Sequence, residues 1–534
     1  MKRMKLTTAG RVVIFVIALV ILAGVGGFGY NYYKNNIAAN NPAVSTPNDS
    51  ATTPSNSGTQ SPTASPSAGG TNTSKPVINL SLDEWIGYKS IIDANGGLQT
   101  APGSLIDQQG IKVNISIIND PTVSSNAIIT GDIDGAGYTV NRTAFLSGKF
   151  QSAGLNIVMP FLTNYSNGGD GIVAKSGINS VEDLVGKRVG APRFGESQAM
   201  IVWLVNHSNL LQSDKDSIIN NMILFDDAAT AGEAFFAGQL DAAGTWQPYL
   251  SYAASESGSH ILFSTASSRN LILSGVIFRE DFAKANADTV TKFINAVIQA
   301  NSMYSTDFSY IRDAMPMFAE LTDNEIVEQC KDAQLMGYSD NVAVLGGTAK
   351  TVYSDMCDIW EQLGEDVNRN IESSLFDLSY IQRLSNQYAN DVATAPSAPS
   401  VAEMTEAEKQ EIIQNYQAIM TQTATVEFVP DSSLFLNPDK AHAVLDEFVK
   451  SAMLLDGSII QIEGNINAST YSESGVALSL KRAQAVADYL IEQGIDPNRL
   501  IVVGNGNTKM VVDPGSKDAS LNRRTDVLFK IVEE

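Results

Sequence analysis

Two stretches poor in apolar residues divide the sequence and limit what can fold as one unit. Residues 35–76 are rich in Ser, Thr, Pro, Asn and Gly, as in SPTASPSAGGTNTS, and ATAPSAPS at 393–400 has a similar character. Such segments bury too little apolar surface to offset the entropy lost on folding. The breaks predict a flexible stalk at 35–76, a large domain at 77–390, a linker with a connecting helix at 391–422, and a small domain at 423–534.

The N-terminal residues 1–34 have the composition of a membrane anchor. An almost uninterrupted apolar run at 12–30 follows the cations Lys2, Arg3, Lys5 and Arg11. About 20 apolar residues span a bilayer as a helix, and flanking cations favour a cytoplasmic N-terminus. We therefore expect a single-pass protein of the cell membrane, with the lipid bilayer as a partner and the bulk of the chain extracytoplasmic. A cleavable signal peptide is the alternative, although its apolar region is normally about 7 to 15 residues.

Composition excludes several kinds of site. The net charge of -23 argues against nucleic acid, because phosphate binding needs a basic face. No Cys precedes Cys330, so a lipid anchor directly after the apolar run is excluded, and Cys330 and Cys357 form either a disulfide, two buried thiols or one of each. The histidines stand apart without zinc spacing, so no metal and no cofactor are expected. They are His207, His260 and His442.

Strand-like and helix-like stretches alternate through the large domain. VINLSL and IKVNISII indicate strands, and VEDLVGKRVGAP followed by SQAMIVWLVNHSNLL indicates a turn, a short strand and a helix. This pattern predicts an α/β domain with a largely parallel sheet. After residue 400 the units are shorter. TATVEFV at 423–429 opens a mixed βαβαββ unit that ends with TDVLFKIV, and MTEAEKQEIIQNYQAIMTQ before it is the connecting helix.

The C-terminal segments EGNINAS, LSLKRAQAVADYLIEQGI, GNGN and NRRTDVLFKI resemble, in this order, the motifs of the OmpA-like domain. The resemblance implies a small α/β domain that binds the stem peptide of peptidoglycan. The family's ligand-binding Arg corresponds to Arg482, whereas its Asp is replaced by Asn467, which removes an ion pair to the ligand's ammonium group. The alternative roles for Arg482 are a solvated helix residue and a structural ion pair. The implied binding residues are Asn467, Leu478, Arg482, Asn522 and Arg524.

The large domain resembles periplasmic solute-binding proteins of ABC-transporter type, in the group that binds taurine, sulfonates, nitrate and thiamine precursors. The segments that carry this resemblance are LSLDEWIGY, GDIDGAGY, NGGDGIVAKSGINSVEDLVGKRVGAPRFGES and AFFAGQLDAAGTWQPYL. It implies two α/β lobes with ligand loops at the carboxyl ends of strands. Arg142 and Arg193 are candidates for holding an anionic group, and Ser197 has helix capping as its alternative role. The implied ligand-binding residues are Trp85, Gly87, Tyr88, Tyr138, Thr139, Arg142, Arg193, Phe194, Glu196, Ser197, Thr245 and Trp246.

Together these patterns predict a membrane-anchored extracytoplasmic protein that captures a small solute for an ABC permease and associates with peptidoglycan. The alternative is a wall-tethered sensor or scaffold without a transport role. No catalytic residues are expected, because neither a cysteine-rich motif nor a GxSxG elbow is present. A stator-like energy coupler is disfavoured, because the apolar run contains no acidic residue.

Overall fold

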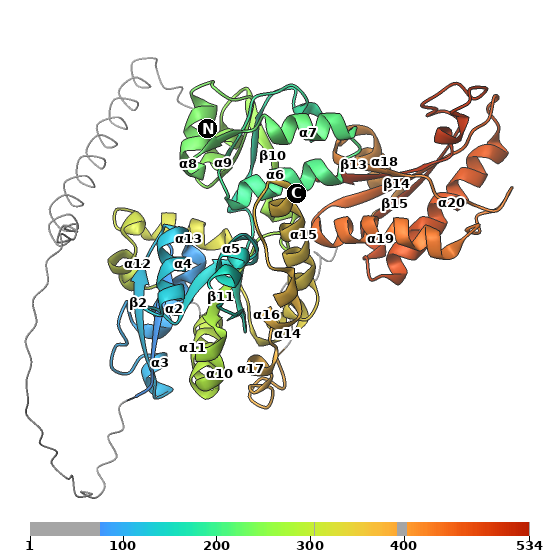
Figure 1. The fold of residues 1–534 in the computed structure, drawn as a ribbon. Helices are drawn as coiled ribbons and strands as arrows, with labels where there is room; N and C mark the ends of the chain where they lie inside the picture. Colours follow the sequence, from blue (N-terminus) through green and yellow to red (C-terminus); the bar gives the residue numbers. More distant parts are fainter. Residues whose placement is uncertain (1–74, 304, 392–402, 533–534) are drawn as a thin grey trace, which may run out of the picture. The chain divides into compact units, whose positions relative to one another are not determined.

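The computed structural model describes residues 75–303, 305–391 and 403–532, and from residue 73 onward the chain forms one compact unit (Figure 1). The segment 12–30, predicted to span the membrane, lies outside the described residues, as does nearly all of the predicted stalk. Among the helices of the described residues, none is both long and apolar enough to cross a bilayer.

The first lobe is built on a mixed sheet in the order β12-β5-β11-β3-β1-β2, with β4 beside β11. β1 pairs in parallel with β2 and β3, whereas β11 and β5 pair antiparallel with their neighbours. The expectation of a largely parallel sheet is therefore wrong in part, because β11, which returns from the second lobe, and the later strand β12 run opposite to the strands beside them. The strands are β1 (Val77–Leu82), β2 (Lys112–Ile117), β3 (Gly135–Thr139), β4 (Ile157–Val158), β5 (Leu162–Ser166), β11 (Leu273–Arg279) and β12 (Ala333–Leu335).

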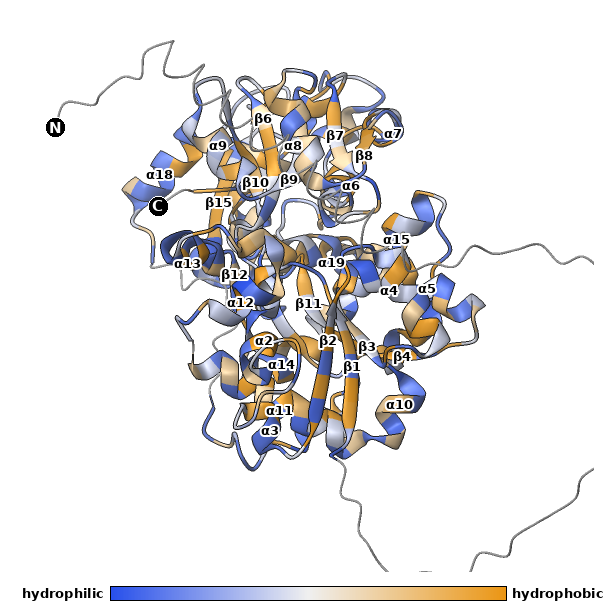
Figure 2. Cartoon of the chain, turned by 90° about the vertical axis from the view of Figure 1, so that its left-hand side faces the viewer, coloured by the Kyte–Doolittle hydropathy of each residue, from blue (hydrophilic) through white to orange (hydrophobic). Residues whose placement is uncertain are grey.

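The second lobe has a five-stranded mixed sheet in the order β10-β6-β9-β7-β8. β7 pairs in parallel with β8 and β9, and β6 pairs antiparallel with β9 and β10. Strands of both sheets, such as β1 and β6, are coloured as strongly apolar in Figure 2, as expected where helices cover a sheet. The strands are β6 (Asp170–Lys175), β7 (Val189–Pro192), β8 (Ile223–Phe225), β9 (Ala242–Trp246) and β10 (Ser259–Ser264).

Two crossing segments join the lobes within the described residues. Residues 167–169 lead from β5 to β6, and residues 265–272 lead from β10 back to β11. Thr265 ties the crossing segments together: its Oγ1 accepts from the Gly168 backbone N at 2.9 Å and lies 2.8 Å from the Ser166 Oγ. A rotation of one lobe against the other must be absorbed in these two segments.

Helices cover both sheets, and α15 (Thr348–Gln362) lies against α5 of the first lobe and α6 of the second. Its Trp360 is fully buried and donates from Nε1 to the Asn141 Oδ1 at 3.1 Å. Beside α15, the first lobe has α2 (Lys89–Asn95), α3 (Leu105–Gln108), α4 (Pro121–Thr130), α5 (Val140–Ser152), α10 (Glu280–Ala285), α11 (Ala287–Met303), α12 (Ser309–Ala314), α13 (Asp323–Lys331), α14 (Tyr338–Leu345), α16 (Glu372–Leu375) and α17 (Ser379–Gln382), and the second has α6 (Glu196–His207), α7 (Gln212–Asn220), α8 (Ala228–Phe236) and α9 (Tyr249–Ser255).

The C-terminal domain is a four-stranded sheet in the order β13-β16-β14-β15, with β14 and β15 parallel and the other pairs antiparallel. The predicted βαβαββ order is present, but the strand expected at 423–429 is displaced. The connecting helix ends at Asn415, and the last residues predicted for this helix belong instead to β13 (Ala418–Ala424). They form a strand because Ile419 and Met420 are buried where β13 pairs with β16. The elements are α18 (Glu406–Asn415), β13, α19 (Pro438–Leu454), β14 (Ile459–Asn465), α20 (Glu473–Glu492), β15 (Leu500–Gly506) and β16 (Thr525–Lys530).

The two cysteines form no disulfide, and His207 packs against an aromatic ring. Cys330 on α13 and Cys357 on α15 are not joined in a disulfide, and Cys357 is fully buried. His207 stacks on Trp203 with ring centroids 4.2 Å apart. No group of three His, Cys, Asp or Glu side chains that could hold a metal ion occurs in the part of the chain that the structure describes.

Candidate functional site

Arg142 connects the two lobes. It lies in the first turn of α5, and its Nη1 donates to the Asp83 Oδ2 of the same lobe at 2.8 Å. Its Nη2 lies 3.3 Å from the Glu196 Oε1, and Glu196 is the first residue of α6 in the second lobe. Thr139 adds a second bond between the lobes, because its Oγ1 donates to the same Glu196 oxygen at 2.9 Å. We call Asp83, Thr139, Arg142 and Glu196 the interlobe bridge.

Local sequence places the interlobe bridge at element ends. Thr139 closes β3 and caps α5, since its Oγ1 accepts from the Arg142 backbone N at 2.9 Å. Asp83 directly follows β1, and a carboxylate at the start of α6 is favoured by the helix dipole. The four side chains therefore meet because two strand ends and one helix start converge where the lobes face each other.

Carboxyl groups outnumber cations around the interlobe bridge. Burial raises the pKa of Asp83, and Arg142 opposes that shift, while the Asp83 Oδ1 is buried without a hydrogen-bond partner. Asp170, the first residue of β6, is 9% exposed and accepts from the Ser166 Oγ at 2.8 Å. Burial, reinforced by the charge of Glu196, raises the pKa of Asp170 to about 7. Three carboxyl groups thus share the field of one guanidinium.

Aromatic residues of the first lobe surround this cluster. Trp85 is half-buried and donates from Nε1 to the Asn164 Oδ1 at 3.0 Å, and its ring lies against Gly169 in the crossing segment. A side chain at Gly87 would collide with Trp85 and Asn164, so glycine at this position permits close packing. Tyr88 and Tyr138 are almost fully buried; the Tyr138 hydroxyl is 2.6 Å from the Ser124 Oγ.

The second lobe presents fewer of the expected residues. Ser197 is buried and donates to the Thr245 carbonyl O at 3.4 Å, and the Thr245 Oγ1 donates to the Ala228 carbonyl O at 2.7 Å. Both hydroxyls are satisfied inside the lobe, so we leave them out of the proposed ligand contacts. Ser197 does not cap α6 either, because the cap position is Gly195. Trp246 ends β9 and is 41% exposed.

Arg193 and Phe194 also differ from the expectation. Arg193 is exposed, with its guanidinium 5.8 Å from the centre of the Phe194 ring. Phe194 stacks on Phe145 at 4.7 Å and lies 6.2 Å from Trp360, so it connects α6 to α5 and α15. Its backbone has φ 58°, a left-handed conformation uncommon outside glycine, which this aromatic packing holds in place.

Three residues of the candidate site were not predicted from the sequence: Asp83, Asn164 and Asp170. Asp83 and Asp170 carry a detectable signal, since each borders a strand next to an aromatic or glycine-rich loop, in LDEW and NGGDG. Asn164 lies inside β5 without any such signal, and only the pairing of β5 with β11 brings it below Trp85.

The residues expected to bind peptidoglycan fall into separate groups in the C-terminal domain. Asn467 accepts at Oδ1 from the Asn522 Nδ2 at 3.0 Å, and Asn522 is fully buried in a loop-closing role. The Arg482 Nε donates to the Ser432 carbonyl O at 2.9 Å, with the guanidinium 5.0 Å from the centre of the Phe428 ring. Arg524 pairs with Asp526 at 2.9 Å and is mostly buried, so it braces β16. Leu478 is half-buried on α20.

Comparison with known proteins assigns both parts of the chain. Residues 106–305 match the family described as NMT1/THI5 like, and residues 427–524 match the OmpA family. The chain joins an NMT1/THI5-like domain to an OmpA domain. The match to the NMT1/THI5-like family lies within the two lobes.

Individual relatives cover the same two regions. A binding protein of Brucella abortus is 23% identical over 289 residues, which covers 52% of this chain and 85% of the relative. Outer membrane protein A of Bordetella avium is 29% identical over 85 residues, or 16% of this chain and 44% of the relative.

Solved structures resemble the NMT1/THI5-like domain in fold alone. The periplasmic aliphatic sulphonate binding protein of Escherichia coli has a TM-score of 0.43 at 15% identity, covering 59% of this chain and 100% of that structure. The periplasmic nitrate-binding protein of Synechocystis PCC 6803 has a TM-score of 0.42 at 10% identity, covering 58% and 88%.

Proposed function

We propose that this protein is an extracytoplasmic, non-enzymatic binding protein that captures a small solute between the lobes of its NMT1/THI5-like domain for an ABC permease. The observation that carries the proposal is the interlobe bridge, in which Arg142 of one lobe contacts Glu196 of the other. Because two crossing segments join the lobes in the described part of the chain, a solute that contacts both lobes selects their closed arrangement.

The charges of the interlobe bridge favour a solute that donates hydrogen bonds or carries a positive charge. Arg142, the guanidinium expected to hold an anion, is already paired with Asp83 and Glu196. An anionic solute would have to displace a carboxylate and would meet Asp170 nearby. An ammonium or amidinium group would instead supply a donor to the unpartnered Asp83 Oδ1. Trp85 offers an aromatic face for the same cation.

A thermal-shift panel tests this function. A solute that binds only the folded state raises the melting temperature according to its concentration relative to Kd. We expect full-length protein to respond to at least one amine or aminopyrimidine at 100 times Kd, equivalent to about 2.7 kcal/mol. Ethanesulfonate, nitrate and phosphate serve as the anionic controls. A shift with anions alone would contradict the proposed charge preference, and no shift across the panel would contradict solute capture.

We further propose that residues 12–30 anchor the protein in the membrane and that the OmpA domain associates with peptidoglycan. Arg482 carries this second proposal, because it is part-buried beside Phe428 and near the carboxylate of Asp431, which could take the place of the missing family Asp. A guanidinium and a carboxylate together suit a ligand with both charges.

Co-sedimentation with purified peptidoglycan sacculi measures wall association. Arg482→Ala should reduce the bound fraction of full-length protein about tenfold, equivalent to roughly 1.4 kcal/mol. Asn467→Asp should increase binding, because the carboxylate restores an ion pair while still accepting from Asn522. Lys481→Ala is the matched control, since Lys481 is an exposed cation adjacent on α20. Equal sedimentation of wild type and Arg482→Ala would refute the assignment.

A further inference from the structure

The crossing segment 265–272 is covered by the OmpA domain. Its contacts come from the last residues of α19 and the loop that follows them, residues 453–458, which we call the docking loop. The Ser268 Oγ donates to the Leu454 carbonyl O at 2.6 Å, and the Gly457 backbone N donates to the Ser267 carbonyl O at 3.1 Å. A Cβ on Gly457 would lie 2.8 Å from the Ser267 Cα, so the two backbones approach closely. The domain is thus seated on a segment that must move when the lobes rotate.

An ion pair between Arg269 and Asp456 holds the OmpA domain on this crossing segment. The Arg269 backbone N donates to the Asp456 Oδ1 at 3.0 Å, and the Arg269 Nε donates to the Asp456 Oδ2 at 3.1 Å. The Asp456 side chain is 4% exposed, and burial raises its pKa while Arg269 opposes the shift. A buried charge pair of this kind is costly to break, because either partner alone would stay buried and uncompensated.

The docking loop is itself rigidly held. Arg499 is 2% exposed; it donates from Nη2 to the Leu455 carbonyl O at 2.7 Å and from Nε to the Ser458 carbonyl O at 2.9 Å. These bonds secure the loop on both sides of Asp456. A displacement of the crossing segment therefore acts on the OmpA domain as a whole, since the loop has little freedom to follow it alone.

Arg269 also lies close to the other crossing segment. Burial raises the pKa of Tyr165, at the end of β5, to about 12, and the neighbouring Arg269 opposes this shift. Thr265 connects the two segments through Gly168, as described above. Both crossing segments are therefore within reach of the Arg269–Asp456 pair.

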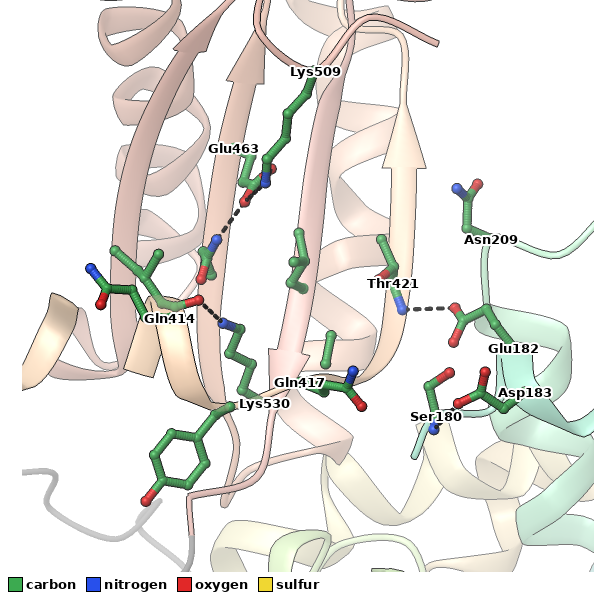
Figure 3. Close-up of a pocket in the computed structure, with 15 residues that line it drawn as sticks. Ser180, Glu182, Asp183, Asn209, Gln414, Gln417, Thr421, Glu463, Lys509 and Lys530 are labelled. Carbon is green, nitrogen blue, oxygen red and sulfur yellow. Dashed lines mark hydrogen bonds and ion pairs between the residues drawn. The ribbon is translucent and has the colours of Figure 1, made fainter. Parts of the chain in front are cut away.

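A second contact links the OmpA domain to the second lobe. The Thr421 backbone N donates to the Glu182 Oε1 at 3.1 Å (Figure 3), and the Val181 backbone N donates to the Ile419 carbonyl O at 2.9 Å. A cavity of about 600 Å³ lies beside these bonds, between the 180–183 loop and the face of the sheet that carries Gln461, Glu463 and Lys530. β13 thus contacts the second lobe, whereas the docking loop contacts the crossing segment.

We propose that the OmpA domain regulates the opening of the two lobes, and is regulated by it, through the Arg269–Asp456 contact. The inference depends on the proposed solute capture in one respect: solute binding is the event that closes the lobes. A domain that fits the crossing segments better in one arrangement shifts the lobes toward that arrangement. Linkage requires the reverse effect to be equal, so lobe closure changes the seating of the OmpA domain by the same factor.

Hydrogen exchange of the full-length protein, followed by mass spectrometry, tests both directions. Asp456→Asn should speed exchange of peptides covering residues 165–171 and 264–273 about tenfold, because the seat that restrains both crossing segments is weakened. Asp439→Asn, an exposed carboxylate on α19 of the same domain, is the matched control and should leave both peptides unchanged. Ser268→Ala, which removes one bond to the docking loop, should give a smaller change in the same peptides.

The reverse perturbation starts at the interlobe bridge. Arg142→Ala should speed exchange in the docking loop, which contains the Gly457 amide bonded to Ser267. If Asp456→Asn changes only residues 453–458 while Arg142→Ala changes only residues around the bridge, the coupling is refuted. If both distant changes appear although no solute in the thermal-shift panel binds, the coupling stands and the proposed solute capture fails.

Discussion

Arg142→Ala is expected to lower the free energy of unfolding at pH 7 by about 3 kcal/mol. Removing one partner of a mostly buried charge cluster leaves the others uncompensated, at a cost of about 3–5 kcal/mol for a fully buried pair. We take the lower end because the Arg142 side chain is 19% exposed. Denaturant unfolding of the full-length protein measures this effect.

Two further variants separate the bridge from a general loss of charge. Arg142→Lys keeps the positive charge but cannot contact Asp83 and Glu196 at once in the same fork, so it should recover only part of the stability. Arg193→Ala removes an exposed guanidinium of the second lobe and should stay within about 0.5 kcal/mol of wild type. An Arg142→Ala protein as stable as Arg193→Ala would contradict the account of the interlobe bridge.

Asp170→Asn is expected to be more stable than wild type at pH 8. At pH 5 the difference in stability between the two proteins should be smaller. The pKa of Asp170 is raised from 3.8 to about 7, so the folded state binds this proton more tightly than the unfolded state. Stability from this group is fully present below pH 4 and is lost as the pH rises through about 7. Between pH 5 and pH 8 the stability advantage of the variant should grow by about 2 kcal/mol.

The matched control for this prediction is Asp241→Asn in the same lobe. Hydrogen bonds from Arg188 lower the pKa of Asp241, so its stabilising effect is present at neutral pH and is lost in acid. This variant should therefore be less stable than wild type at both pH 5 and pH 8, with no gain at alkaline pH. The denaturant midpoints of unfolding of both variants and of wild type, measured at the two pH values, test this prediction. A constant difference between Asp170→Asn and wild type would show that Asp170 ionises normally in the folded protein.

Much of the fold follows from local patterns in the sequence. The runs VINLSL and IKVNISII form β1 and β2, and the stretch after RFGES forms α6, because apolar periodicity and helix starts are local properties. In the C-terminal domain, the position of one strand differs from the prediction. AIMTQTA reads as the end of a helix by itself, and pairing with β16, more than 100 residues later in the chain, makes it a strand.

The candidate site was less predictable, because its charges depend on partners distant in sequence. Arg142 and Glu196 were both expected, but only the structure shows that they bind each other, and this pairing is the reason we propose a cationic solute. Ser197 and Thr245 were expected on ligand loops, yet they lie in α6 and β9 and face the interior of the second lobe. A loop can be located from sequence, whereas the direction of a side chain is set by packing between elements.

Calorimetric titration of the full-length protein with a matched pair of solutes tests the central claim most directly. The pair is the best amine of the panel and its neutral isostere, each titrated into wild type and Asp83→Asn. The account predicts that wild type binds the amine at least about tenfold more tightly than the isostere, equivalent to roughly 1.4 kcal/mol, and that Asp83→Asn loses this preference. Equal affinities of wild type for both solutes, or an unchanged preference in Asp83→Asn, would contradict the assignment of the interlobe bridge as the solute-binding site.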